Sequence, residues 1–141
     1  MYITDRANRI DLQRGGCMYL KIDFNSDEAF YIQLRNQIIY GIATSKIQEG
    51  DNLPSVRVMA DYIGINMHTV NKAYSILKQE GYLKIDRRKG NVIAIDCNKY
   101  EAMRELKESL KTILAEAHCK NVNCEEVIDI VKQIYSEFER G

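Results

Sequence analysis

The sequence lacks most of the features that mark membrane, secreted, disordered or large multidomain proteins. Its 141 residues include one proline, eight glycines and no tryptophan, and 45% of them are hydrophobic, which excludes a low-complexity or disordered chain. No apolar run approaches the roughly 20 residues that span a bilayer as a helix, and the polar N-terminus excludes a secretory signal. The chain is too short for a TIM barrel or a complete Rossmann fold. We therefore expect one small cytoplasmic domain with an appendage.

Residues for catalysis and metal binding are equally scarce. The only histidines are His68 and His118, and no glycine-rich motif is present that would cradle a phosphate. His118, Cys119 and Cys124 lack the spacing of a four-ligand zinc site, and we expect the two cysteines to be small packing residues. We predict neither an enzyme nor a metal or other cofactor. All four cysteines are expected to be reduced thiols: Cys17, Cys97, Cys119 and Cys124.

Charge of neither sign is in excess, because 20 basic side chains balance 20 acidic ones. The distribution is nevertheless uneven. Residues 55–90 carry seven basic and three acidic groups, a net charge of +4, whereas residues 96–141 carry seven and ten, a net charge of −3. Attraction to phosphates depends on the charge of the contacting face rather than on the total. The net charge of zero therefore does not exclude a nucleic-acid partner for the central region.

Residues 1–17 show neither helical nor strand periodicity, and we expect them to be disordered or to be a non-native extension. Arg14-Gly15-Gly16 lies just before Met18, and a purine-rich ribosome-binding sequence read in this frame would encode Arg-Gly-Gly. One hypothesis is that the native chain starts at Met18. A genuine mobile arm is the alternative, and the sequence favours neither.

The first regular element after this segment is predicted to be a helix. Alternation of apolar and polar residues over Tyr19–Phe24 indicates a short extended segment before it, and Ser26 or Asp27 is expected to cap the helix. The helix is expected to run to about Ser45, and turn-forming residues 48–52 separate it from the next element. Apolar side chains recur in it at helical spacing: Tyr31, Leu34, Ile38 and Ile42.

Two further helices are predicted close together. Ser55 is an N-cap residue for a short helix that Gly64 ends, and Asn66 caps a third helix over about Met67–Glu80, which Gly81 stops. Two helices joined by about three residues that include a glycine indicate a helix-turn-helix. Seven apolar side chains are expected to face inward: Met59, Ala60, Ile63, Val70, Ala73, Tyr74 and Leu77.

A hairpin is predicted directly after the third helix. Tyr82–Asp86 and Asn91–Ile95 indicate two strands, and residues 87–90, Arg-Arg-Lys-Gly, lie between them as a turn. A helix-turn-helix followed by such a hairpin is a winged helix, here with a basic wing tip. The fold class we expect is α+β and mainly α, with the winged helix over residues 18–96.

The remaining residues, 97–141, are predicted to form a tail of two helices that begin after Asn98 and Asn123. Glu101 and Glu126 each follow three residues later, as in a capping box. Both helices carry apolar stripes that need a partner, either the winged helix of the same chain or the tail of a second chain. We favour dimerisation through these stripes: Met103, Leu106, Leu110 and Ile113, then Val127, Val131, Ile134 and Phe138.

Residues 53–83 resemble the DNA-binding domain of the GntR family of bacterial transcription regulators. The family pattern is L-P-S-x-R-x-L-A-x-x-L-G-V, then [SN]-x-x-T-V-x-x-A-[LY]-x-x-L-x-x-x-G. Upstream, Tyr31 and Gln33 match the P-I-Y-x-Q-I opening of the family, and the short tail resembles the YtrA-like subfamily. Two departures concern Arg88, where the wing usually has glycine, and Asn71, where an arginine is frequent. Identical positions are Leu53, Pro54, Ser55, Arg57, Ala60, Gly64, Asn66, Thr69, Val70, Ala73, Tyr74, Leu77 and Gly81.

The resemblance implies which residues contact DNA. The third helix would enter the major groove, where Asn71 suits an adenine edge and Lys72 suits a guanine edge or a phosphate. The wing tip would reach the minor groove, and Arg57 the backbone or a base edge. For His68 and Arg57, the alternative is an exposed side chain without a role. The expected DNA-binding residues are Ser55, Arg57, Asn66, His68, Thr69, Asn71, Lys72, Arg87, Arg88, Lys89 and Gly90.

The function that these features predict is a dimeric transcription repressor that binds a palindromic operator in double-stranded DNA. The YtrA-like resemblance implies a transporter operon as the target. The alternative is a winged helix that serves as a protein-interaction module without specific DNA binding. The sequence identifies no small-molecule effector, and we expect a two-helix tail to offer little room for the roughly 300 Å³ of a typical ligand pocket.

Overall fold

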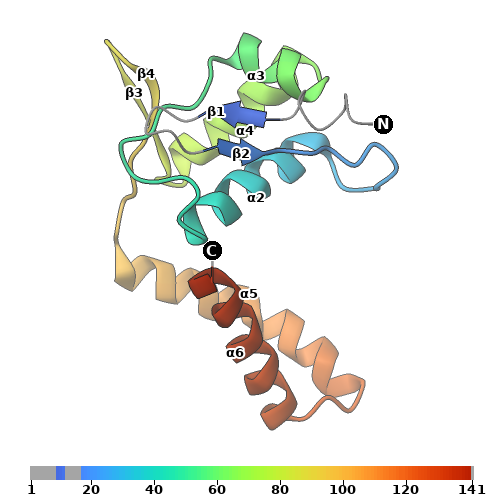
Figure 1. Cartoon of the computed structure of the whole chain (residues 1–141). Helices are drawn as coiled ribbons and strands as arrows, with labels where there is room; N and C mark the ends of the chain where they lie inside the picture. Colours follow the sequence, from blue (N-terminus) through green and yellow to red (C-terminus); the bar gives the residue numbers. More distant parts are fainter. Residues whose placement is uncertain (1–8, 12–16, 141) are drawn as a thin grey trace. The chain divides into compact units, whose positions relative to one another are not determined.

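The computed structural model describes residues 9–11 and 17–140, which fall into two compact units. The first unit ends at Ile95, and the second is Asp96–Arg140. Among the described residues, no helix combines the length and the apolar character that a membrane span requires. The first unit contains strands β1 (Arg9–Asp11) and β2 (Cys17–Tyr19), helices α2 (Phe30–Ala43), α3 (Val56–Ile63) and α4 (Met67–Gln79), and strands β3 (Leu83–Asp86) and β4 (Gly90–Ile93) (Figure 1). This is the mainly helical α+β winged helix that the sequence predicts.

The N-terminal segment differs from the sequence prediction. Strand β1 pairs antiparallel with β2, with Arg9 opposite Tyr19 and Asp11 opposite Cys17. The expectation of disorder over residues 1–17 is wrong for these strands, because two segments of three residues are too short to show periodicity and are held by backbone pairing. Residues 1–8 and 12–16 lie outside the described residues, and the start at Met18 stays a prediction.

Side-chain amides of α2 hold the segment that precedes it. Gln33 is 7% exposed, and its Nε2 donates to the carbonyl oxygens of Asp23 and Glu28 at 3.1 and 3.0 Å, while its Oε1 accepts from Asp23 N at 2.8 Å. Gln37 Oε1 accepts from Lys21 N at 2.9 Å. The extended segment is therefore attached to the helix by side chains rather than by a sheet, which buries Leu20.

The start of α2 also differs from the prediction. Its N-cap is Ala29, which makes no side-chain cap hydrogen bond, so the predicted capping by Ser26 or Asp27 is wrong. Ser26 Oγ instead accepts from Glu28 N at 3.1 Å within the preceding turn. The helix begins later than predicted because Gln33 already holds this turn against its first residues.

The local signals for α3 and α4 are confirmed. Ser55 Oγ accepts from Val58 N at 3.3 Å, and Asn66 Oδ1 accepts from His68 N at 2.8 Å, so each side chain satisfies one of the free N–H groups at a helix start. Gly64 has φ of 72° and ends α3 in the left-handed conformation that glycine adopts without strain. Gly64 and the N-cap Asn66 thus define a turn of three residues between the helices.

One apolar core holds the helices and the wing together. All seven side chains predicted to face inward from α3 and α4 are at most 5% exposed. Leu83 and Ile93 bring the base of the wing into the same core. The core residues contributed by the other segments are Leu20, Ile22, Leu34, Ile38, Ile47 and Leu53.

The base of the wing is wider than two strands. β3 and β4 pair antiparallel from Leu83 opposite Ile93 to Asp86 opposite Gly90. The segment before α3 adds to the other edge of β4, because Leu53 N donates to Asn91 O and Ile93 N donates to Asp51 O, both at 2.9 Å. The wing is therefore attached to the start of the helix-turn-helix through backbone hydrogen bonds.

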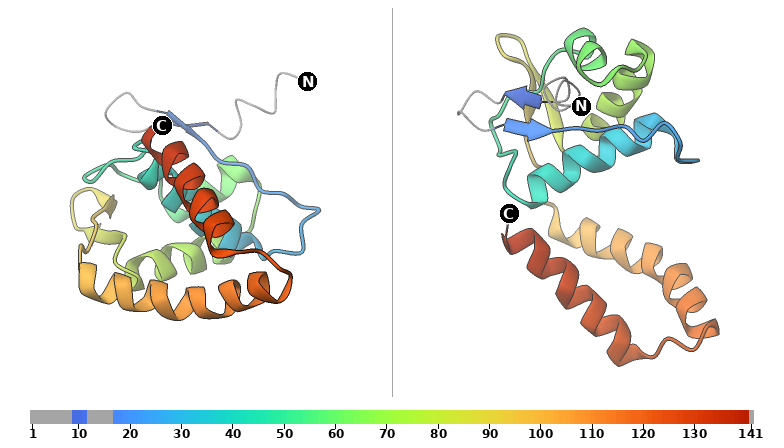
Figure 2. Two further views of the ribbon diagram at one scale, coloured as in Figure 1. Left: turned by 90° about the horizontal axis from the view of Figure 1, so that it is seen from below. Right: turned by 45° about the vertical axis from the view of Figure 1, so that its right-hand side comes forward.

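The second unit consists of helices α5 (Lys99–Cys119) and α6 (Cys124–Arg140). Asn98 Oδ1 accepts from Glu101 N at 3.2 Å, and Asn123 and Glu126 form a reciprocal capping box with both bonds at 2.9 Å. The two helices diverge from the turn between them, as the left view of Figure 2 shows. Neither helix contains a buried residue.

The phenol of Tyr74 gives a prediction about stability. Its hydroxyl donates to Pro54 O at 2.8 Å, so Tyr74→Phe should lower the free energy of unfolding by about 1 kcal/mol at neutral pH. Denaturant unfolding measures the change. Tyr40→Phe is the matched control, since Tyr40 is 56% exposed and should tolerate the substitution. An equal loss in both variants would contradict the role of the bond.

The burial of Tyr74 also predicts how the stability difference between wild type and Tyr74→Phe depends on pH. It raises the pKa of the Tyr74 hydroxyl above its ordinary value of 10.0, so only the neutral phenol suits the folded state. The stability that this contributes is complete below the ordinary pKa and is lost as the pH rises above it, because the unfolded chain ionises first. The stability difference between wild type and Tyr74→Phe should therefore shrink above about pH 10.

Candidate nucleic-acid interface

The outer face of α4 is polar and accessible. His68, Asn71 and Lys72 are exposed, and Thr69 is half-buried. Val70 and Tyr74 anchor the opposite face in the core, which fixes how the outer face is presented. A helix of this kind with amide, imidazole and ammonium groups along one side can hydrogen-bond base edges and phosphates.

Three predicted DNA-binding residues lie at or near the starts of α3 and α4, and two of them already accept capping hydrogen bonds. Asn66 is exposed, yet its Oδ1 is engaged with His68 N. Ser55 is exposed and its Oγ is engaged with Val58 N. Arg57 is exposed on the first turn of α3. Of these three, only Arg57 has no capping role in the described structure.

The wing tip is a tight loop of three residues. Arg87, Arg88 and Lys89 are exposed between β3 and β4, and Gly90 has φ of 83°. A methyl group on Gly90 would meet nothing within 4 Å, so the positive φ and not space favours glycine here. The three-residue loop is thus followed by a left-handed glycine, which is the first residue of β4.

A carboxylate at the base of the loop organises it. Asp86 Oδ1 accepts from Arg88 N at 2.8 Å and from Lys89 N at 3.0 Å. These two backbone hydrogen bonds, with the charges of Lys89 and Lys84, lower the pKa of Asp86 below its ordinary value. The ionised carboxylate thus holds the loop while the three basic side chains project from it.

A cleft of about 370 Å³ lies between the wing tip and the start of α3. Ser55 and Lys89, two of the predicted DNA-binding residues, both line it. Asn52 also lines it, and its Nδ2 donates to Lys89 O. Sequence reasoning missed Asn52, because nothing in its neighbourhood signals a hydrogen bond to a residue 37 positions away. The other lining residues are Leu53, Pro54, Gly90 and Asn91.

Tyr31 also contacts a residue of the candidate interface. Sequence reasoning assigned Tyr31 only a packing role. The ammonium nitrogen of Lys72 lies 4.0 Å from the centroid of the Tyr31 ring. Tyr31 belongs to α2 and is half-buried. The helical spacing of the apolar residues indicated its inward position, but no sequence signal indicates a cation over its face.

The tail residues predicted to dimerise remain accessible in the chain. Met103, Leu106, Ile113, Val131 and Ile134 are exposed. The other three predicted residues, Leu110, Val127 and Phe138, are half-buried. The exposed apolar side chains form two stripes without a covering layer, one on each helix.

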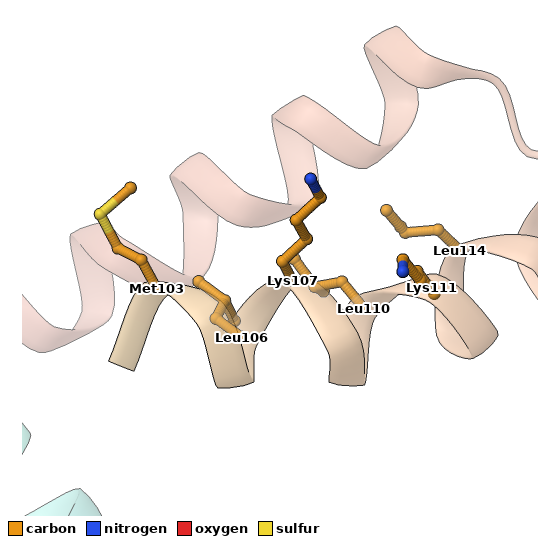
Figure 3. Close-up of a pocket in the computed structure, with 6 residues that line it drawn as sticks. All are labelled: Met103, Leu106, Lys107, Leu110, Lys111 and Leu114. Carbon is orange, nitrogen blue, oxygen red and sulfur yellow. The ribbon is translucent and has the colours of Figure 1, made fainter. Parts of the chain in front are cut away.

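An open groove of about 320 Å³ lies along α5 (Figure 3). All of its lining residues belong to α5, so it is a surface groove on one helix rather than an enclosed ligand pocket. Lys107 and Lys111 border the groove, whose apolar lining is Met103, Leu106, Leu110 and Leu114.

Among the described residues, no group of three or more histidine, cysteine, aspartate or glutamate side chains is placed to hold a metal ion. Cys119 and Cys124 are exposed and not joined by a disulfide. The expectation that these two cysteines pack as small apolar residues is therefore wrong for the single chain, because the turn that they flank lies at the surface.

Comparison with known proteins identifies similar chains. The pattern of the family described as bacterial regulatory proteins, gntR family, matches residues 29–93. The HTH-type transcriptional repressor YtrA of Bacillus subtilis is 31% identical over 125 residues, which cover 86% of this chain and 96% of that protein. The uncharacterized HTH-type transcriptional regulator YhcF of the same organism is 33% identical over 99 residues, covering 70% and 79%.

Solved structures of other proteins also resemble this chain over most of its length. A structure titled as a transcriptional antiterminator from Listeria monocytogenes has a TM-score of 0.74 at 27% identity and covers 83% of this chain and 90% of that one. YtrA from Sulfolobus acidocaldarius, titled a GntR-family transcription factor, has a TM-score of 0.55 at 35% identity and covers 64% and 96%.

The Asp86 cap yields a test in the free protein. The amide signals of Arg88 and Lys89 should titrate in NMR spectra with a midpoint below the ordinary aspartate pKa of 3.8, because both amides donate to this carboxylate. Because the pKa of Asp86 is lowered in the folded state, the cap contributes its full stability at pH values above the ordinary aspartate pKa. This stability is lost as the pH falls through the lowered pKa of Asp86. Asp86→Asn should abolish the titration, whereas Asp61→Asn on α3 should leave it unchanged. A midpoint at or above 3.8 would show that the cap is not formed in solution.

Proposed function

Because the chain belongs to the GntR family of bacterial transcription regulators, which carry a DNA-binding helix-turn-helix and are not enzymes, we propose that it is a homodimeric repressor. It binds a palindromic operator in double-stranded DNA. The observation that carries the proposal is the pairing of an exposed polar face on α4 with an exposed basic wing tip on the same core. The relative that is named a repressor, YtrA of Bacillus subtilis, supports the direction of regulation. A transporter operon is the target that the YtrA-like subfamily implies.

The proposed contacts divide into two kinds. α4 enters the major groove, where the amide of Asn71 pairs with an adenine edge and so carries sequence information. The wing tip follows the minor groove, with Arg87 and Arg88 on phosphates and Lys89 and Gly90 at the groove itself. Ser55, Arg57, Asn66, His68 and Thr69 add backbone or base contacts. Phosphate contacts position the protein, and the few base contacts specify the site.

Dimerisation supplies the contacts that one winged helix lacks. Two copies related by a twofold axis read two half-sites about one helical turn apart, which doubles the interface. The tail supports this assembly, because both of its helices expose apolar stripes. Charge supports it too: Lys107 and Lys111 border the α5 groove, while α6 carries five acidic and two basic side chains, a net charge of −3. A second copy can place α6 against this groove.

A gel-shift and footprinting series on DNA from upstream of its own gene tests the DNA contacts. Asn71→Ala should cost about 1–3 kcal/mol on the operator and relax specificity at one base pair. Arg88→Ala or Lys89→Ala should weaken binding to all sequences alike and reduce the slope of log affinity against log salt by about one. Lys120→Ala, in the turn of the tail, is the charge-matched control and should bind as wild type. Wild-type binding that salt does not weaken, or no binding at all, would favour a protein-interaction module.

Sedimentation tests the assembly. The full chain should sediment as a dimer, and a chain ending at Ile95 as a monomer, because the second unit carries the proposed interface. Leu106→Glu and Ile134→Glu should each shift the full chain toward monomer, since a buried unpaired carboxylate is costly. Thr112 lies on the other side of α5, so the Thr112→Glu variant is the control and should remain dimeric. A dimer that persists without the tail would refute the assignment.

A further inference from the structure

The contact between Lys72 and Tyr31 lies at the seam between α2 and α4. Lys72 is exposed on the outer side of α4, and its ammonium nitrogen lies 4.0 Å from the centroid of the Tyr31 ring, well within the range of a cation–π interaction. Two turns further along α4, Arg35 of α2 forms an ion pair with Glu80, with Nε donating to Oε2 at 3.1 Å. Core packing between α2 and α4 holds the two helices together, and the ion pair adds a second contact on this side of the seam.

The contact turns Lys72 toward one side of the recognition helix. Neighbouring residues of an α-helix point about 100° apart around its axis. Asn71, the residue with the clearest base-reading chemistry, therefore projects away from the side on which Lys72 meets Tyr31. With α4 in the major groove as proposed above, a lysine held at that edge would face the DNA backbone, and contact with a base would require it to leave the ring and move toward Asn71.

We propose that Tyr31 is a positioning residue for DNA binding, which holds the Lys72 ammonium at the α2 edge of α4 and commits it to a backbone phosphate rather than to a base. This inference rests on the DNA-binding function proposed above. The ring covers one side of the ammonium group and leaves N–H donors on the other side for a phosphate oxygen. A flexible lysine loses conformational entropy when it is ordered on DNA, and a side chain already ordered in the free protein loses less.

The chemistry of the two groups agrees with this division of roles. An ammonium group is a point charge without the planar fork that matches two acceptors of guanine, so a phosphate satisfies it as well as any base does. The phenol ring supplies a face of negative potential that does not compete for the phosphate. Tyr31 consequently adds affinity without adding sequence preference.

A double-mutant cycle on the full-length protein tests the proposal, with equilibrium binding to operator and to unrelated duplex DNA. Tyr31→Leu should weaken binding to both DNAs about two- to fivefold, the size of an exposed cation–π contact. Lys72→Met should weaken both and reduce the salt slope by about one. In the Lys72→Met background, Tyr31→Leu should cause no further loss. Tyr31→Phe keeps the ring and should bind as wild type, as should Tyr40→Leu, which removes an exposed ring at the other end of α2.

Two results would overturn the proposal while the proposed function stands. One is an equal loss from Tyr31→Leu with and without Lys72, which would mean that the ring acts through packing alone. The other is a Lys72→Met variant that loses preference at a single operator base pair, which would assign Lys72 to a base. A wild-type protein that binds neither DNA would overturn the proposed function and this inference with it.

A measurement without DNA tests the contact itself. Protons next to the ammonium group should be shifted upfield by the ring current of Tyr31 in NMR spectra of the free protein. The shift should persist in Tyr31→Phe and disappear in Tyr31→Leu. An unshifted Lys72 in the wild type would overturn the positioning role, because the side chain would then not be held over the ring.

Discussion

The hydrogen bond from the Tyr74 hydroxyl to Pro54 O is the constraint on which the interface depends. Tyr74 is fully buried in the middle of α4, so its ring fixes the recognition helix in the core. Pro54 ends the segment whose backbone pairs with β4, through Leu53 N to Asn91 O. One phenol therefore links α4 to the segment that pairs with β4. Together with the core packing of Leu83 and Ile93, this bond keeps α4 and the wing at a fixed separation, which the proposed contacts in adjacent grooves would require.

The elements that could be predicted from sequence are those whose causes are local. The caps at Ser55 and Asn66, the left-handed Gly64 and the inward faces of α3 and α4 follow from residues within one or two turns of each other. The N-cap of α2 failed for the complementary reason. Gln33 holds the preceding turn through hydrogen bonds to two backbone carbonyl groups, and these bonds replace the predicted capping by Ser26 or Asp27. The position of β1 escaped prediction because three residues carry no period.

The parts of the candidate site that sequence reasoning missed are contacts between distant segments. Asn52 and Lys89 are 37 residues apart, and Tyr31 and Lys72 lie on different helices. Each pair forms only after the core has brought its two segments together. Residue type alone gave Tyr31 a packing role and Asn52 none. The proposed DNA contacts follow from residue type and local pattern, whereas the contacts that Asn52 and Tyr31 make with Lys89 and Lys72 depend on tertiary structure.

The departure of the wing from the family pattern has a physical explanation in the loop geometry. Arg88 stands where a glycine is usual, but among the described residues the positive φ of the loop falls on Gly90 and not on Arg88. An arginine is therefore accommodated without backbone strain, since only the left-handed position demands glycine. The Asp86 cap, which engages the amides of Arg88 and Lys89, holds the loop in this conformation. Arg88 thus adds a cation at the tip while the hairpin keeps its shape, and an added cation strengthens attraction to phosphates.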